Sequence, residues 1–473
     1  MATAETLLRG SAMAMAMAAA VQRGNVRAVD LVEASLARIA ATDGRVNAFT
    51  AVLAARARAR AAEVDALPAS ATLPLRGVPF AVKNLFDVAG LATLAGSKIE
   101  ADSPPARCDA LLVQRLEAAG AVLVGALNMD EYAYGFTTEN SHHGPTRNPH
   151  DLARIAGGSS GGSGAALAAG QVAITLGSDT NGSIRVPASL CGVFGLKPTY
   201  GRLPRSGSYP FVASLDHLGA FARTVQDLAL SYDLLQGIDA ADPACAQRPV
   251  APTAGDLQRS LHGLRIGVLG GWFERMAGPD ARAAVERVAS ALGTTQRVAP
   301  VAWPGAEAAR AAAFLISNAE GGSLHLSDLR RRAEDFEPLS RDRFLAGALL
   351  PAHWVLQAQR VRRHVARQAA LLFERFDVLL APATPCVAPE IGTEWLELEG
   401  QRLPARASLG LLTQPLSSIG LPVCAVPVWG VHARLPIGVQ LIAAPWREDL
   451  VLRVAAALEQ RGVVCAPIAE LLP

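Results

Sequence analysis

One lysine lies where it could support proton transfer. Only three of the 44 basic residues are lysines, and Lys83 ends the short apolar run Gly77-Val-Pro-Phe-Ala-Val. Burial at the end of such a run lowers the pKa of a lysine amine, so that the amine can accept a proton, which an arginine guanidinium practically never does. The alternative is a structural lysine in an ion pair, for example with Asp87, and position alone favours this alternative.

A glycine- and serine-rich segment, Ala156-Gly-Gly-Ser-Ser-Gly-Gly-Ser-Gly164, is the second candidate. Its composition is that of a flexible linker, but it stops abruptly in an alanine-rich stretch. A phosphate-binding loop would need Gly-Lys-Ser/Thr at its end or a third glycine in the Rossmann frame, and both are missing. Glycines around serines at a helix start predict strained backbone that aims the hydroxyl groups.

The third candidate is Gly177-Ser-Asp-Thr-Asn-Gly-Ser-Ile-Arg-Val-Pro187. Gly182, directly before Ser183, lets the backbone approach a ligand closely. Successive N–H groups from Thr180 to Ser183 could converge on one oxygen, which is the arrangement that stabilises an oxyanion. An ordinary Asx-type turn before a helix is the alternative.

The elements that must position these segments alternate between strands and helices, which predicts an α/β sheet. We expect strands at 77–83, 121–125, 264–269, 377–381 and 435–443. Helices are expected throughout 5–70 and at 109–119, 163–170 and 449–460.

The whole chain, 1–473, is expected to form one composite domain. Its parts are a helical segment over 1–70, a catalytic core over 71–236, a surface connection over 237–263, and the rest of the sheet with its covering helices over 264–473. The polar middle of the chain needs apolar partners from both sides, which favours one domain over two.

Composition excludes several classes of function. With 51% hydrophobic residues, 18% charged residues and a net charge of +2, the chain predicts a globular enzyme without a nucleic-acid or membrane partner. No apolar run is long enough to span a membrane. The stretch from Leu7 to Val21 faintly resembles a secretory leader, but it leads into an amphipathic helix pattern, and we expect the cytoplasm.

The six cysteines form no CxxC pair and are expected to be free thiols in a reducing compartment. The nine histidines form no HExxH motif, so we expect no metal site, and nothing indicates a cofactor.

Taken together, the three segments resemble the amidase signature family. Lys83, Ser159 and Ser183 stand in flanks like the family's G-x-P-x-x-x-Lys strand, GGSSGGS segment and D-T-G-G-S-I-R segment. The resemblance covers nearly the whole chain. Further matching segments are Asn128-Met-Asp-Glu131, Thr138-Glu-Asn-Ser141, Gly144-Pro-Thr-Arg-Asn-Pro149, Gly195-Leu-Lys-Pro-Thr199, Ser214-Leu-Asp216, Asp377 to Pro382, Gly420-Leu-Pro422 and Leu435-Pro-Ile-Gly-Val-Gln440.

The resemblance implies one large α/β domain with a central mixed sheet, flanked by helices on both faces, and a Ser–cis-Ser–Lys triad. Ser183 would be the nucleophile that attacks the amide carbonyl. Ser159, which follows a cis peptide bond in the family, would relay its proton to Lys83 as the base. Thr180, Asn181, Gly182 and Ser183 would form the oxyanion hole, and Ser160, Asp179 and Arg185 would orient this network.

Three positions depart from the common family pattern. Asn84 stands where an aspartate usually follows the lysine, which would help keep the Lys83 amine neutral. Asn181 replaces the first glycine of D-T-G-G-S, and it suits a substrate contact and a turn residue about equally well. Ser417-Ser418 stands where an asparagine is frequent.

These departures resemble the branch of carboxybiuret hydrolases of cyanuric acid degradation and related ureide amidases. The branch implies a small, polar, carboxylated amide substrate and the release of ammonia. It also implies a small helical companion chain, in a homodimer or heteromer. Tyr134, Gly135 and Asn181 are candidate substrate contacts, and Arg360, Arg362 and Arg363 on an expected helix are candidates for a substrate carboxylate.

Other functions remain as alternatives. The glutaminase subunit of a tRNA-dependent amidotransferase shares two of the segments above, but Asn84 and Asn181 count against it. A fatty-acid amide hydrolase is disfavoured because no membrane-binding apolar segment is evident. A non-catalytic scaffold is disfavoured by the intact Lys83, Ser159 and Ser183.

Overall fold

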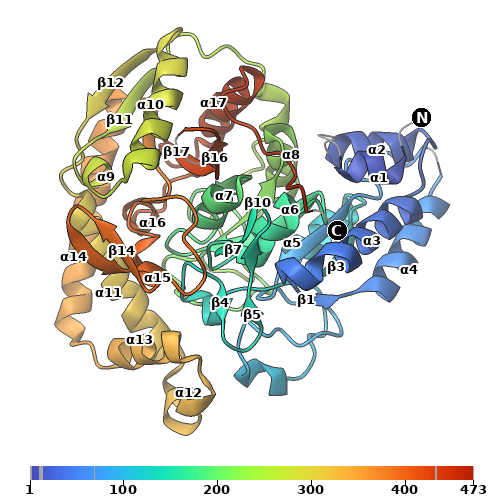
Figure 1. The fold of residues 1–473 in the computed structure, drawn as a ribbon, viewed down its shortest axis with the longest axis horizontal. Helices are drawn as coiled ribbons and strands as arrows, with labels where there is room; N and C mark the ends of the chain where they lie inside the picture. The colour runs from blue at the N-terminus through green and yellow to red at the C-terminus, as the bar shows by residue number, and fades with distance from the viewer. Residues whose placement is uncertain (1–2, 10–13, 69, 432–433, 472–473) are drawn as a thin grey trace.

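A single eleven-stranded sheet runs through the protein (Figure 1). The computed structural model describes residues 3–9, 14–68, 70–431 and 434–471. Strand order is β1-β3-β2-β8-β10-β9-β16-β17-β13-β11-β12, with both parallel and antiparallel neighbours. The predicted α/β fold with a central mixed sheet flanked by helices is therefore confirmed.

The described elements alternate along the chain. The strands are β1 (Phe49–Val52), β2 (Pro79–Lys83), β3 (Val122–Leu127), β4 (Glu139–Asn140), β5 (Gly144–Pro145), β6 (Arg147–Asn148), β7 (Asp151–Ile155), β8 (Ile174–Asp179), β9 (Phe194–Lys197), β10 (His217–Ala222), β11 (Arg265–Leu269), β12 (Arg297–Val301), β13 (Val378–Pro382), β14 (Trp395–Leu398), β15 (Gln401–Pro404), β16 (Val423–Val428) and β17 (Ile437–Ala443). The α-helices are α1 (Ala4–Arg9), α2 (Ala14–Gln22), α3 (Ala28–Val46), α4 (Ala54–Ala66), α5 (Leu111–Ala118), α6 (Gly161–Ala168), α7 (Arg185–Cys191), α8 (Val225–Leu235), α9 (Trp272–Arg275), α10 (Pro279–Gly293), α11 (Ala306–Leu324), α12 (Leu326–Arg331), α13 (Pro338–Ala348), α14 (Ala352–Arg375), α15 (Ala405–Ser408), α16 (Gln414–Ser418) and α17 (Glu448–Gln460).

Parallel pairing brings two of the candidate segments to one edge of the sheet. Strand β2 lies between β3 and β8 and runs parallel to both, and Val82 pairs with Leu176. Every residue of these three strands is buried, and β2 and β3 accordingly have mainly apolar sequences. Strand β8, which carries Thr175, Ser178 and Asp179, was not predicted from the sequence. Because the carboxyl ends of parallel strands meet at one edge, Lys83 and Asp179 come close together.

The helical prediction for residues 5 to 70 is wrong at one place. Phe49–Val52 forms β1, an edge strand that pairs antiparallel with β3. Four residues between two helices carry too little pattern to reveal a strand, and the pairing partner lies more than 70 residues away. Residues 10–13 and 69 of this segment are outside the described residues.

The connection over 237–263 contains only the short 3₁₀ helix Ala254–Asp256. Strands from both sides of it share the sheet through the β9–β16 pair. Helices α11 to α14 form a lobe at one end of the molecule (Figure 1). Within the described residues, no helix has the length and apolar character needed to cross a membrane.

Candidate active site

Lys83 is fully buried and contacts two serine hydroxyl groups. Its Nζ lies 2.6 Å from Ser159 Oγ and 2.9 Å from Ser178 Oγ. Burial lowers the pKa of the Lys83 amine to about 7, although three nearby aspartates oppose the shift. Asp87 instead accepts a hydrogen bond from Thr93, so the proposed Lys83–Asp87 ion pair is wrong. The amine can therefore be neutral near physiological pH, as a general base must be.

The Ser159 segment is a tight turn between β7 and α6. The peptide bond between Gly158 and Ser159 is cis. A Cβ on Gly158 would lie 2.1 Å from Asp130 Oδ2, and one on Gly161 would lie 2.4 Å from Thr138 Oγ1. The glycines thus allow the turn to pack closely against residues 130–138, in addition to the unusual backbone angles expected from the sequence.

Ser183 lies near the end of the loop between β8 and α7, and this loop is held against the turn. The Ser160 N–H donates a hydrogen bond of 3.3 Å to the Ser183 carbonyl. Gly182 has φ 141°, and a Cβ there would lie 2.1 Å from Thr413 Oγ1, so only glycine fits. Among the hydrogen bonds of the described residues, none uses the N–H groups of Asn181, Gly182 or Ser183 as donors. These groups are free to receive an oxyanion.

Arg185 and Asp179 form a fully buried pair that fixes the ends of the same loop. Arg185 Nε and Nη2 bind the two carboxylate oxygens of Asp179 at 3.0 and 2.9 Å. The other contacts of Arg185 are with the Thr413 carbonyl, Gln440 and Ser417. Burial alone would raise the pKa of Asp179, but the Arg185 charge and hydrogen bonds hold it well below its usual range. Ser417, one of the departures from the family pattern, thus serves as an acceptor for this guanidinium.

Ser160 supports the Lys83 environment through Ser178. Its hydroxyl donates to the Ser178 carbonyl at 3.2 Å. Ser178 was not among the residues predicted from the sequence, although it lies in the third candidate segment. The signal was available, because the β8 strand that carries it can pair with the strand that ends at Lys83.

A small cavity lies beside Ser183. We call this cavity the acyl pocket. It has a volume of about 10 Å³, and its lining includes the predicted contacts Tyr134, Gly135 and Asn181 together with Ser183 and Arg343. The Arg343 guanidinium lies 3.7 Å from the centre of the Tyr134 ring, and burial lowers its pKa. Arg343 is on α13, more than 150 residues after Ser183, so no local pattern indicated that it would reach this pocket.

The three arginines expected to meet a carboxylate do not line this pocket. Arg360 and Arg363 are exposed on α14. Arg362 donates to the carbonyl groups of Ser418 and Ser214, which ties α14 to the core. These residues lie on different sides of α14, because neighbouring positions of a helix face different directions, and none of the three is in the lining of this pocket.

The two asparagine departures have different environments. The Asn84 side chain binds Thr50 Oγ1 and the Leu94 N–H, and the hydrogen bonds of Lys83 go to Ser159 and Ser178, so an effect of position 84 on Lys83 would act through charge and not through contact. Asn181 Nδ2 donates to Ser317 Oγ at 2.7 Å, while its buried Oδ1 has no protein partner among the described residues. That oxygen is available to a substrate N–H.

All six cysteines are free thiols. Within the ranges that the structure describes, no three His, Cys, Asp or Glu residues gather as metal ligands do.

Comparison with known proteins gives independent evidence on the family of this chain. Residues 30–452 match the amidase family. The chain is 59% identical to the 1-carboxybiuret hydrolase subunit AtzE of Pseudomonas sp. (strain ADP), over 94% of this chain and 97% of that protein. It is 40% identical to one of the subunits of the glutamyl-tRNA(Gln) amidotransferase of Roseiflexus sp. (strain RS-1), over 93% of this chain and 94% of that protein. A solved structure of "an unexpected vestigial protein complex", which concerns the origins of an s-triazine catabolic enzyme, matches with a TM-score of 0.92 and 58% identity, over 96% of this chain and 99% of the other.

Proposed function

We propose a mechanism and a substrate for this chain, which belongs to the amidase signature family and is an amidohydrolase. In this proposal, Ser183 is the nucleophile that becomes acylated, and a small carboxylated ureide is the substrate. The observation that carries the mechanism is the fully buried Lys83 amine within 2.6 Å of Ser159 Oγ. A neutral amine next to a relay hydroxyl can take the role of general base that an imidazole has in other serine hydrolases.

In the proposed reaction, Ser183 Oγ attacks the amide carbonyl while its proton passes through Ser159 to Lys83. The free N–H groups of residues 181–183 bind the oxyanion, which is the kind of contact that contributes most to acyl-transfer catalysis. The C–N bond then breaks as the same relay returns the proton to the leaving nitrogen. Water next attacks the acyl-enzyme by the same route and releases the acid and Ser183.

The acyl pocket supports a small anionic substrate. Arg343 provides a guanidinium that no carboxylate pairs with among the contacts of the described residues, and it lines the same pocket as Ser183. Guanidinium groups bind carboxylates in a bidentate manner. Asn181 Oδ1 is positioned for a ureide N–H. The pocket is small, so Arg343 must leave the Tyr134 ring for the substrate to enter. A 1-carboxybiuret-type substrate, as named for the relative with 59% identity, has both groups.

A partner subunit is part of this proposal. The relative with 59% identity is named as a subunit, and the solved neighbour is a protein complex. We propose that this chain likewise acts with a small companion chain.

The test is ammonia release from 1-carboxybiuret, biuret, allophanate, malonamate, glutamine and a simple aliphatic amide, with and without co-expressed companion. We expect turnover of the carboxylated ureides that Ser183→Ala abolishes. Turnover of glutamine alone would contradict the proposed substrate and favour the amidotransferase function.

Arg343→Gln isolates the carboxylate contact. Loss of one bidentate charged contact should raise KM for the carboxylated substrates by about 10- to 100-fold with little change for biuret, which has no carboxylate. Arg341→Gln is the matched control, because Arg341 is on the same helix and pairs with Asp342 and Glu334 at the surface. An equal loss for biuret and 1-carboxybiuret would refute the role of Arg343.

A further inference from the structure

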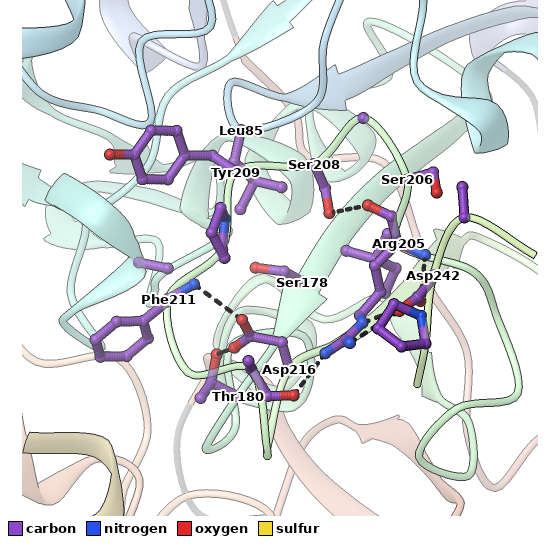
Figure 2. A pocket seen from close by; sticks show the side chains of 17 residues that line it. Leu85, Ser178, Thr180, Arg205, Ser206, Ser208, Tyr209, Phe211, Asp216 and Asp242 are labelled. Carbon is purple, nitrogen blue, oxygen red and sulfur yellow. Dashed lines mark hydrogen bonds and ion pairs between the residues drawn. The ribbon is translucent and has the colours of Figure 1, made fainter. Parts of the chain in front are cut away.

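The acyl pocket adjoins a larger cavity of about 300 Å³, and the two share part of their wall. The shared residues are Ala133, Thr180 and Phe211. Figure 2 shows how this wall is held: Asp216 accepts hydrogen bonds from Thr180 Oγ1 at 2.6 Å and from the Phe211 N–H at 2.9 Å. Space next to the acyl pocket is thus available for the rest of a longer substrate.

One polar side chain of the acyl pocket has no role in the steps proposed above. Gln414, the first residue of α16, lines the pocket and is only 3% exposed. Its Oε1 accepts a hydrogen bond of 3.1 Å from Arg310 Nε. Among the described residues, none accepts a hydrogen bond from Gln414 Nε2, and this nitrogen is not fully enclosed by protein. The pocket is therefore the space that its N–H groups can face.

The orientation of the Gln414 amide follows from the chemistry of its neighbour. A guanidinium N–H only donates, so the amide atom that faces Arg310 must be the oxygen, and the NH₂ group points elsewhere. The Arg310 guanidinium also lies 5.2 Å from the centre of the Phe314 ring, which is part of the pocket wall. Arg310 thus holds a hydrogen-bond donor toward the pocket from behind its wall.

Asn181 provides the complementary acceptor in the same pocket. Its Nδ2 is bound to Ser317 Oγ at 2.7 Å, and its buried Oδ1 has no partner among the described residues. Buried polar groups without a partner are costly, so two of them in one pocket indicate a polar ligand. A cavity of about 10 Å³ holds about one water-sized molecule, so one small planar group can reach both amides.

A ureide carries the groups that match this pair. It has an N–H between two carbonyl groups, where a malonyl amide has a CH₂ group. We infer that Gln414 is a substrate-binding residue that donates to the second carbonyl oxygen of a ureide, while Asn181 accepts from the N–H between the two carbonyls. Arg310 is a positioning residue that acts through Gln414. This inference rests on the proposed function, and it names the residues that distinguish a ureide from other amides of the same size.

The experiment compares three neutral amides by ammonia release: biuret, malonamide and propionamide. Malonamide has a CH₂ group where biuret has the central N–H, and propionamide has no second carbonyl. Gln414→Leu should lower kcat/KM for biuret and malonamide about tenfold more than for propionamide, the size of one lost hydrogen bond. Gln359→Leu is the matched control, because Gln359 is half-buried on α14 and does not line the acyl pocket. It should leave all three values unchanged.

Two further variants separate the contacts. Asn181→Gly should lower kcat/KM for biuret more than for malonamide, because only biuret has the central N–H. Arg310→Leu should lower kcat/KM for malonamide relative to propionamide, because the Gln414 amide is no longer held, and Arg310→Lys, which keeps a donor, should restore most of the loss. A purely structural role of Arg310 would lower the values for malonamide and propionamide equally.

Equal losses for all three amides in Gln414→Leu, or the same pattern in Gln359→Leu, would overturn the inference. Such a result leaves the proposed function intact, because that function fails separately, through absence of Ser183-dependent turnover of 1-carboxybiuret. If the wild type leaves any of the three amides uncleaved, a crystal structure of Ser183→Ala with biuret decides. A biuret carbonyl oxygen within hydrogen-bond distance of Gln414 Nε2 supports the inference, and any other placement, or no bound ligand, overturns it.

Discussion

The buried lysine makes a quantitative prediction about pH. Burial places the pKa of the Lys83 amine at about 7, compared with 10.5 in an exposed side chain. The neutral amine is the active form of a base, so kcat/KM should fall as the pH drops through this value. From pH 8 to pH 6 the neutral fraction falls from about 0.9 to about 0.1, which gives about a tenfold loss of rate, with a slope of about one in log kcat/KM below the midpoint.

The assay is ammonia release from 1-carboxybiuret between pH 5.5 and pH 9, at substrate concentrations well below KM, with circular dichroism at each pH to confirm that the protein stays folded. kcat/KM reports the free enzyme, which is the state of the structure. Lys83→Arg is the companion variant. A guanidinium does not lose its proton in this range, so this variant should lose at least about 10³-fold in kcat/KM at every pH. A midpoint near the ordinary lysine value, or a Lys83→Arg variant with wild-type rates, would refute the reasoning.

Three further changes follow from named contacts. Gly182→Ala should lower kcat by about 10²- to 10³-fold, because its Cβ would push the oxyanion loop off Thr413, whereas Gly255→Ala, with open space around it, should have no effect on ammonia release. Arg406→Met leaves the fully buried Asp130 and Glu337 without their shared guanidinium and should lower the free energy of unfolding in urea by about 3–5 kcal/mol; a loss below about 1 kcal/mol would contradict this. Asn84→Asp should shift the midpoint of the pH profile upward, because a buried carboxylate on the residue after Lys83 favours the ammonium form, as Asp130, Asp179 and Asp216 do; an unchanged midpoint would contradict this.

The fold class could be predicted from the sequence, because buried strands of the sheet have apolar sequences that can be recognised locally. The fully buried strands β2 and β3 have short apolar sequences near glycine and proline and were predicted, whereas β8, which carries Thr175, Ser178 and Asp179, was not. Strand β1 was not predictable, because its four residues are defined by pairing with β3 rather than by their own pattern.

For the site too, residues with a local sequence pattern could be predicted, and residues placed by long-range contacts could not. Lys83, Ser159 and Ser183 were chosen from local flanks, and the structure adds the burial of all three and the 2.6 Å distance between Lys83 Nζ and Ser159 Oγ. Arg343 was not found, because nothing within α13 tells which of its arginines faces a loop more than 150 residues away. The arginines of α14 were chosen as positive charges on an expected helix, and that pattern does not indicate whether a side chain reaches the acyl pocket. Asn181 and Asn84 have different surroundings that the sequence does not reveal. Asn181 binds Ser317 beside the acyl pocket, whereas Asn84 binds Thr50 of a neighbouring strand.

The central claim is that amide cleavage passes through an ester of Ser183. The most direct test mixes enzyme with 1-carboxybiuret, stops the reaction with acid within milliseconds, and determines the intact mass and the modified peptide by mass spectrometry. We predict a mass increase equal to the acyl group on the peptide that contains Ser183, and none in Ser183→Ala. Ammonia release by a folded Ser183→Ala variant at the wild-type rate, or an acyl group on any other residue, would contradict the claim.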